Sequence, residues 1–185
     1  MDIHTAMMTR RTIHYWKPLP IQEDAIQKAL LAAHMAPCHK FTWPWRFTRV
    51  GSQGRTKIFD LTVQLKKGDK KEISERMRAT LVRKIVNPAE LIVVSMVRCE
   101  DDFTDKENYA AVSCAIQNLS LSLHASGYGT KWSTGKVTRD PESYSILNVD
   151  ASKEEIVGFI WAGVPDIVPE APKRPDVTEY IRTVE

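Results

Sequence analysis

Three short polar and aromatic stretches carry the side chains best suited to bind a flat, charged ligand. Arg10-Arg11-Thr12 could hold a phosphate, because a guanidinium donates paired, charge-assisted hydrogen bonds to an oxyanion. Ala36–Phe47, which reads APCHKFTWPWRF, combines a cysteine and a histidine with two tryptophans that supply flat apolar area. Gly127–Gly135 reads GYGTKWSTG. Taken alone, the arginine pair is more typical of two solvated surface residues, because adjacent arginines are common on protein surfaces.

Other kinds of chemistry have little support in the sequence. The phosphate-loop, dinucleotide, zinc-protease and serine-hydrolase motifs are all absent. The five histidines are scattered and no Cys/His cluster is present, so we expect no metal site. Cys38 adjoins His39, but it follows a predicted helix C-terminus, where the helix dipole disfavours a thiolate. We therefore expect no catalytic side chain of the nucleophile type.

The elements that must position these stretches are helices alternating with few strands. Hydrophobic periodicity predicts helices at 2–9, 22–36, 52–67, 71–86, 105–126 and 140–147, and strands at 46–50, 91–97 and 156–164. The stretch 127–135 is expected to be a loop. The helix at 105–126 is apolar around most of its circumference, so it should be buried or packed against a partner. This order predicts one layered α/β domain over residues 1–185, with a core at about 9–165 and an extended tail at 166–185.

Composition sets the remaining bounds. The chain has 185 residues, of which 43% are hydrophobic and 26% charged, as in ordinary globular proteins. The net charge of +3 is too small to indicate a nucleic-acid partner. The longest apolar runs are too short to span a membrane, and the N-terminal MDIHTAMMTRR lacks a signal-peptide pattern. We therefore expect a cytoplasmic protein with no membrane or nucleic-acid partner.

The three stretches and the segments between them resemble the nitroreductase family. RRTIHYWKPLPIQEDAIQKALLAAHMAPCHKFTWPWRFTRV is similar to that family's opening, with its Arg and Ser/Thr doublet, proline-flanked helix, Ala-Pro loop and Pro-Trp-x-Phe strand entry. AAVSCAIQNLSLSLHASGYGTKWSTG and KEEIVGFIWAGVP resemble its central helix, its aromatic-Gly-Trp loop and its late strand. The match runs in order from Thr9 to Pro165 and is closest to the small single-domain branch.

The resemblance implies a fold and a reaction. The fold would be a three-layer α/β (α+β) arrangement, in which helices flank a central mixed or antiparallel sheet and a long central helix lies at a homodimer interface. FMN would be bound at that interface. Hydride would pass from NAD(P)H through the flavin to a nitroaromatic, a quinone or a similar flat acceptor.

The same resemblance carries site residues over to this sequence. Met35 and His39 match positions that usually act from the partner subunit. Leu121–Ser126 matches a nicotinamide-nucleotide segment, although ordinary helix packing explains it equally well. The matching flavin-binding positions are Arg10, Arg11, Thr12, Met35, His39, Lys131, Trp132 and Ser133. The nucleotide positions are Leu121, Ser122, Leu123, His124, Ala125 and Ser126.

Two positions depart from the family pattern. Trp43 stands where an amide side chain usually faces the flavin, so it could narrow the substrate pocket as part of its wall. Ser133 stands where an arginine often binds the phosphate, and Lys173 or Arg174 in the tail could replace that charge.

Two alternatives to a nitroreductase remain at this point. The Lys- and Arg-rich region 51–87 could make the chain a non-catalytic binding module for an acidic partner. Trp43 and Ser133 leave open a flavoprotein of the same fold with a different reaction.

Overall fold

A computed structural model describes residues 1–184; Glu185, the last residue of the predicted tail, lies outside the described residues. The helices are α1 (Ile3–Thr9), α2 (Glu23–His34), α3 (Ser52–Lys67), α4 (Glu75–Leu81), α5 (Asp102–Ala125), α6 (Lys136–Arg139) and α7 (Pro141–Leu147), with short helical segments η1 (His39–Phe41), η2 (Val82–Val86) and η3 (Val177–Tyr180). The strands are β1 (Trp16–Lys17), β2 (Trp45–Arg49), β3 (Glu90–Val97), β4 (Gly129–Ser133) and β5 (Glu154–Pro165).

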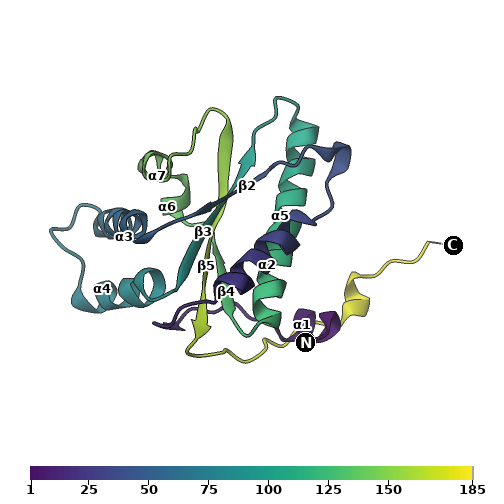
Figure 1. Cartoon of the computed structure of the whole chain (residues 1–185), viewed down its shortest axis with the longest axis horizontal. Coiled ribbons are helices and arrows are strands. Elements are labelled where there is room, and N and C mark those ends of the chain that lie inside the picture. The colour runs from purple at the N-terminus through teal and green to yellow at the C-terminus, as the bar shows by residue number, and fades with distance from the viewer. Residues whose placement is uncertain (185) are drawn as a thin grey trace.

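The strands form one antiparallel sheet between two layers of helices. β5 pairs with β1, β3 and β4, and β3 pairs with β2. Figure 1 shows α3, α4, α6 and α7 on one face of this sheet and α2 and α5 on the other. This arrangement confirms the predicted three-layer α/β fold with a long central helix.

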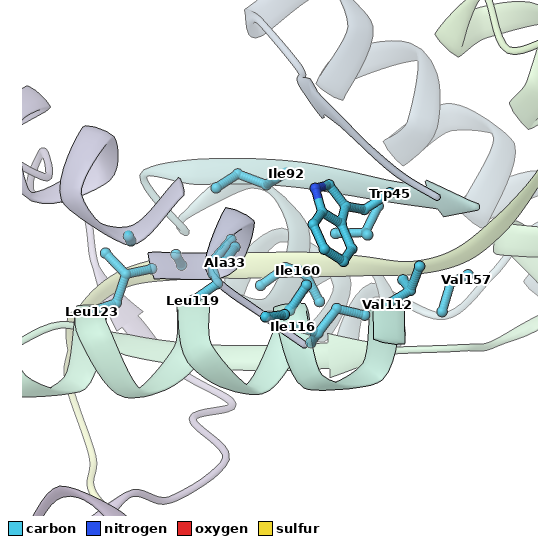
Figure 2. Packing of buried hydrophobic residues seen from close by; sticks show 14 of the residues in the cluster. Ala33, Trp45, Ile92, Val112, Ile116, Leu119, Leu123, Val157 and Ile160 are labelled. Carbon is cyan, nitrogen blue, oxygen red and sulfur yellow. The ribbon is translucent and has the colours of Figure 1, made fainter. Parts of the chain in front are cut away.

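Alternating side chains of the central strands divide the core into two clusters. On β3, Ile92 and Val94 face α2 and α5, whereas Leu91 and Val93 face α3 and α4, because successive strand residues point to opposite faces. Figure 2 shows the α5 side of this core, where residues of α5 point toward the strand that carries Ile160. The α5 residues in this cluster that the figure labels are Val112, Ile116, Leu119 and Leu123.

The long helix α5 is nevertheless not buried all round. Phe103, Tyr109 and Cys114 of this helix are exposed. The prediction that this helix is buried or meets a partner therefore holds for the face that packs on the sheet, and other apolar side chains of the helix stay exposed.

Two predicted elements need correction. The stretch expected to be a loop at 127–135 contains the strand β4, which pairs with β5 from Gly129–Gly163 to Ser133–Phe159. Gly129 is there for close packing and not for a turn, since a Cβ atom built on it would lie 2.4 Å from Ile13 Cγ1. The helix expected from residue 71 begins at Glu75, and its last turn is the wider π form, η2.

Candidate functional site

The arginine pair leaves α1 and enters the edge of the sheet. Asp2 caps α1 by accepting a hydrogen bond from Thr5 N at 3.0 Å, and the helix ends at Thr9. Thr12 then forms a parallel bridge with Thr130 of β4, and Ile13 N donates to the carbonyl oxygen of Thr130 at 3.0 Å. The backbone on both sides of Arg10-Arg11 is therefore fixed by regular hydrogen bonds.

A cavity of about 840 Å³ opens beside this pair. Segment 169–172 and Arg174 of the tail form one wall of it, so the tail passes the arginines before it projects away from the body (Figure 1). Lys173, the other predicted tail cation, is not among the lining residues. The lining residues are Met7, Met8, Arg10, Arg11, Thr12, His14, Gln117, Pro169, Glu170, Ala171, Pro172 and Arg174.

Positive charge predominates in this cavity, since Arg10, Arg11 and Arg174 line it and Glu170 is the one acid among its described lining residues. Within residues 1–184, no carboxylate oxygen lies within 4.0 Å of a side-chain nitrogen of Arg10, Arg11 or Arg174. Burial, followed by the charges of Arg11 and Arg174, lowers the pKa of Arg10. We name Arg10, Arg11 and Arg174 the arginine cluster. Such a cluster attracts an anion, and a phosphate fits guanidinium donors best.

The strand β4 presents two different surfaces to the site. Thr130 and Trp132 line a small hollow of about 130 Å³ together with Arg10 and Thr12. Trp132 lies against the backbone of β5, where its Nε1 donates to the carbonyl oxygen of Val157 at 3.3 Å. Only glycine at position 158 leaves room for the indole, because a Cβ there would lie 2.1 Å from Trp132 Nε1.

The other side of β4 carries Lys131, which the sequence predicted, and lies near Lys84, which it did not. Lys131 and Ser133 line a second cavity with Lys84. Burial, then the charge of Lys84, lowers the pKa of Lys131. Burial likewise lowers the pKa of His14, and the charges of Lys131 and Lys84 add to the effect. The structure thus adds Lys84 and His14 to the predicted residues.

The signal for Lys84 in the sequence was only its place in a basic helix. Lys84 lies in the π turn η2. π turns are rare in proteins overall, and those that occur are often found at functional sites. For His14 the signal was its position shortly after Arg10-Arg11-Thr12.

The residues predicted to act from a partner subunit gather elsewhere. His39 Nδ1 lies 2.8 Å from Glu107 Oε2, and Thr42 Oγ1 donates to Asn108 Oδ1 at 2.7 Å, so the segment 38–43 is attached to α5. We name this segment the aromatic loop. Trp43 is 45% exposed and Met35, just before the loop, is 73% exposed.

The aromatic loop also has an unusual backbone. Lys40, Phe41 and Trp43 have φ values of 55°, 54° and 45°, a region that non-glycine residues rarely adopt. Strain of this kind persists only where surrounding contacts hold it, and it is concentrated at functional sites. Trp45, by contrast, is a core residue whose Nε1 donates to His34 Nδ1 at 3.1 Å.

The residues of the segment 121–126, which was matched to a nicotinamide nucleotide, point in different directions from the end of α5. Leu123 is fully buried, so its side chain is not available to a ligand in this conformation. Leu121, Ser122 and Ala125 line a third cavity, of about 340 Å³, together with Met35.

His124 lies on the side of the arginine cluster, where its Nε2 is 2.9 Å from Thr9 Oγ1. Burial and then the charges of Arg10 and Arg11 lower its pKa. Ser126 forms the C-terminal cap of α5.

The family model described as "Nitroreductase family" matches residues 7–164, which is most of the chain. The chain belongs to the nitroreductase family. This confirms the resemblance seen in the sequence.

Individual relatives agree with the assignment. A Bacillus subtilis (strain 168) protein provisionally named NAD(P)H nitroreductase YfhC is 28% identical over 172 residues, covering 92% of this chain and 88% of the relative. The crystal structure of a nitroreductase-like family protein from Bacillus cereus has a TM-score of 0.84 at 25% identity, covering 100% of this chain and 97% of that one. A provisionally named nitroreductase from Desulfovibrio desulfuricans, solved in complex with FMN, has a TM-score of 0.77 at 18% identity, with 100% and 98% coverage.

The helices of this nitroreductase family member were compared with the length and apolarity that a membrane span requires. Across residues 1–184, every helix is too short or too polar to serve as a membrane span.

Proposed function

We propose that this chain is an FMN-dependent oxidoreductase that uses NAD(P)H to reduce a nitroaromatic, a quinone or a similar flat acceptor. When bound, FMN supplies hydride transfer between the donor and the acceptor. The observation that carries the proposal is the arginine cluster, an unpaired group of cations on a cavity wall in a chain of this family. The FMN complex of the structural relative supports the choice of cofactor.

The residues present fit such a cofactor. Arg10, Arg11 and Arg174 would hold its phosphate through charge-assisted hydrogen bonds. Thr12 and Trp132 lie next to them and offer a hydroxyl and a flat apolar wall. Lys131, with Lys84, would stabilise negative charge at the edge of the ring, and Ser133 lies in the same wall. Lys173 has no assigned contact in this arrangement.

We further propose that the working unit is a homodimer that shares its flavin sites. Several large apolar side chains are exposed on α1, on and just after α2, in the aromatic loop and on α5, and contiguous exposed apolar surface is typical of an interaction site. The exposed apolar residues in question are Ile3, Met7, Met8, Leu31, Met35, Phe41, Phe103 and Tyr109. Met35, His39 and Trp43 would then line the partner's site. We also propose that the chain forms a single domain and works in the cytoplasm. Its three cysteines are free, as is usual in a reducing compartment.

The nucleotide would reach the site from the end of α5. Ser122, His124, Ala125 and Ser126 have accessible surface there, Leu121 lines the third cavity, and Leu123 is left out because it is buried.

The purified protein tests the proposal directly. We expect it to be yellow and to release FMN on denaturation. With added NADH or NADPH it should reduce a quinone or a nitroaromatic. A colourless protein that takes up no added FMN would contradict the proposal and favour a non-catalytic binding module.

A further inference from the structure

The second cavity reaches well beyond the residues assigned to the cofactor. It has a volume of about 530 Å³ and lies between α3, α4 and η2 on one side and β4 and β5 on the other. Arg76 and Lys84 both line it, and the eight residue steps from one to the other correspond to about 12 Å along a helix. The cavity therefore has two ends: one beside Lys84 and Lys131, and one beside Arg76 and Lys66.

The floor of this cavity is apolar. Phe159 and Trp161 of β5 lie at its base, with ring centroids 6.2 Å apart, and Leu81 and Ile85 contribute from the helices. These four side chains are all buried. A flat, apolar body would be desolvated well on such a floor.

The rim of the cavity carries one sign of charge. Its charged lining residues are Lys66, Arg76, Lys84 and Lys131, and the described residues that line it include no acid. Within residues 1–184, none of these cations has a carboxylate oxygen within 4.0 Å of its side-chain nitrogens. Hydroxyl groups of Ser74 and Thr80 add polar contacts. Apolar floor and cationic rim together favour a ligand that is apolar at one end and anionic at the other.

We infer that this cavity admits an aromatic acceptor with an acidic substituent, whose anionic group is bound by Lys66 and Arg76 and whose ring lies toward Lys131. The inference rests on the proposed function, because the Lys131 end is the one assigned to the flavin ring. It makes Lys66 and Arg76 specificity-determining residues, and selects anionic over neutral flat acceptors.

A pair of acceptors that share one nitroaromatic ring and differ in charge tests this assignment. 4-Nitrobenzoate is anionic at neutral pH, and methyl 4-nitrobenzoate is its neutral ester. In the double variant Lys66→Gln/Arg76→Gln we expect kcat/KM for 4-nitrobenzoate to fall about tenfold, and kcat/KM for the ester to change little. The double variant should show this loss as a higher KM for 4-nitrobenzoate, with kcat little changed.

A binding measurement without turnover provides an independent readout. Without NAD(P)H, calorimetric titration of the protein as purified should give tighter binding of 4-nitrobenzoate than of the ester. The double variant should lose that difference. The charge-matched control Lys67→Gln/Lys70→Gln removes two neighbouring cations that do not line the cavity, and should retain it.

Equal binding of the two compounds to the unaltered protein would overturn the inference. So would an equal loss for acid and ester in the double variant, or the same loss in the control variant. These outcomes are distinct from failure of the proposed function, which would be seen as absent FMN and no reduction of either compound.

Discussion

The arginine cluster and the aromatic loop were both recognised as parts of one binding site, yet they are built in opposite ways. The arginine cluster lies between regular elements, α1 and β4, and its charges have no acidic partners among residues 1–184. The aromatic loop has left-handed backbone at three non-glycine residues, and side-chain contacts attach it to α5. We propose that the arginine cluster binds an anion and that the exposed aromatic loop lies against a second copy of the chain.

Their positions on α5 explain why one subunit does not bring them together. The aromatic loop contacts Glu107 and Asn108, whereas Gln117 and His124 lie beside the arginine cluster. Gln117 follows Glu107 by ten residue steps of helix, which is about 15 Å along the axis. We propose that the aromatic loop which completes one flavin site comes from a second copy of the chain.

The largest effect should come from the arginine cluster. Arg10→Ala should weaken FMN binding by about 1.5–3 kcal/mol, roughly 10- to 150-fold in Kd, because the phosphate loses a charge-assisted partner. Riboflavin lacks the phosphate and should lose much less affinity, as measured by fluorescence titration of both ligands. Arg139→Ala, a change to an exposed arginine outside the described cavities, is the control. Equal losses for FMN and riboflavin would show that Arg10 does not contact the phosphate.

The next largest effect should come from Gly158, the residue of β5 on which the Trp132 indole packs. Gly158→Ala places a methyl group where the indole lies, so we expect the free energy of unfolding to fall by about 1–3 kcal/mol. Denaturant titration measures this loss, and FMN affinity should fall with it because Trp132 must move. Gly51→Ala, where a Cβ meets nothing within 4 Å, should show neither change. Unaltered stability of Gly158→Ala would mean that Trp132 is not held against β5.

A smaller effect is expected in the aromatic loop. His39→Ala should lower flavin occupancy about two- to fivefold, since an exposed pair such as His39–Glu107 contributes only about 0–1 kcal/mol. The ratio of flavin to protein absorbance measures it. Glu107→Gln keeps the shape of the partner and separates two roles of His39. An equal loss in Glu107→Gln indicates that His39 only holds the loop, and a smaller loss indicates direct contact with the flavin. Full occupancy in both variants would exclude either role.

The smallest effect should be that of Cys38→Ser. Cys38 Sγ accepts a hydrogen bond from Trp43 N at 3.3 Å and lies 3.2 Å from Thr42 Oγ1, and a serine hydroxyl can replace both contacts. NAD(P)H-dependent reduction of a quinone should therefore remain within about twofold of the unaltered protein. Loss of turnover with full flavin content would instead make Cys38 a participant in the reaction.

The sequence was sufficient for most of the fold because periodicity reports which face of an element is buried. The helix at 52–67 was placed to the residue, and β3 and β5 were found from their apolar runs. β4 was missed because the glycines in and beside it were all read as turn residues. Gly129 is instead explained by its close contact with Ile13, a residue far away in the chain.

The site was predicted less completely for the same kind of reason. Arg10, Arg11 and Thr12 are neighbours in sequence, so their grouping could be seen directly. Lys84 joins Lys131 only through the π turn and the folding of η2 onto the sheet. The choice of Arg174 over Lys173 likewise depended on the path of the tail, which residue types do not specify.

The most direct test of the shared site is to mix two defective chains. One carries Arg10→Ala and the other carries His39→Ala/Trp43→Ala, and they are unfolded together, refolded with FMN and freed of unbound ligand. If each site combines the arginine cluster of one subunit with the aromatic loop of the other, half of the randomly mixed dimers contain one intact site. About a quarter of all sites should then regain unaltered FMN affinity. Flavin content no higher than the average of the two variants refolded separately would contradict a site shared between subunits.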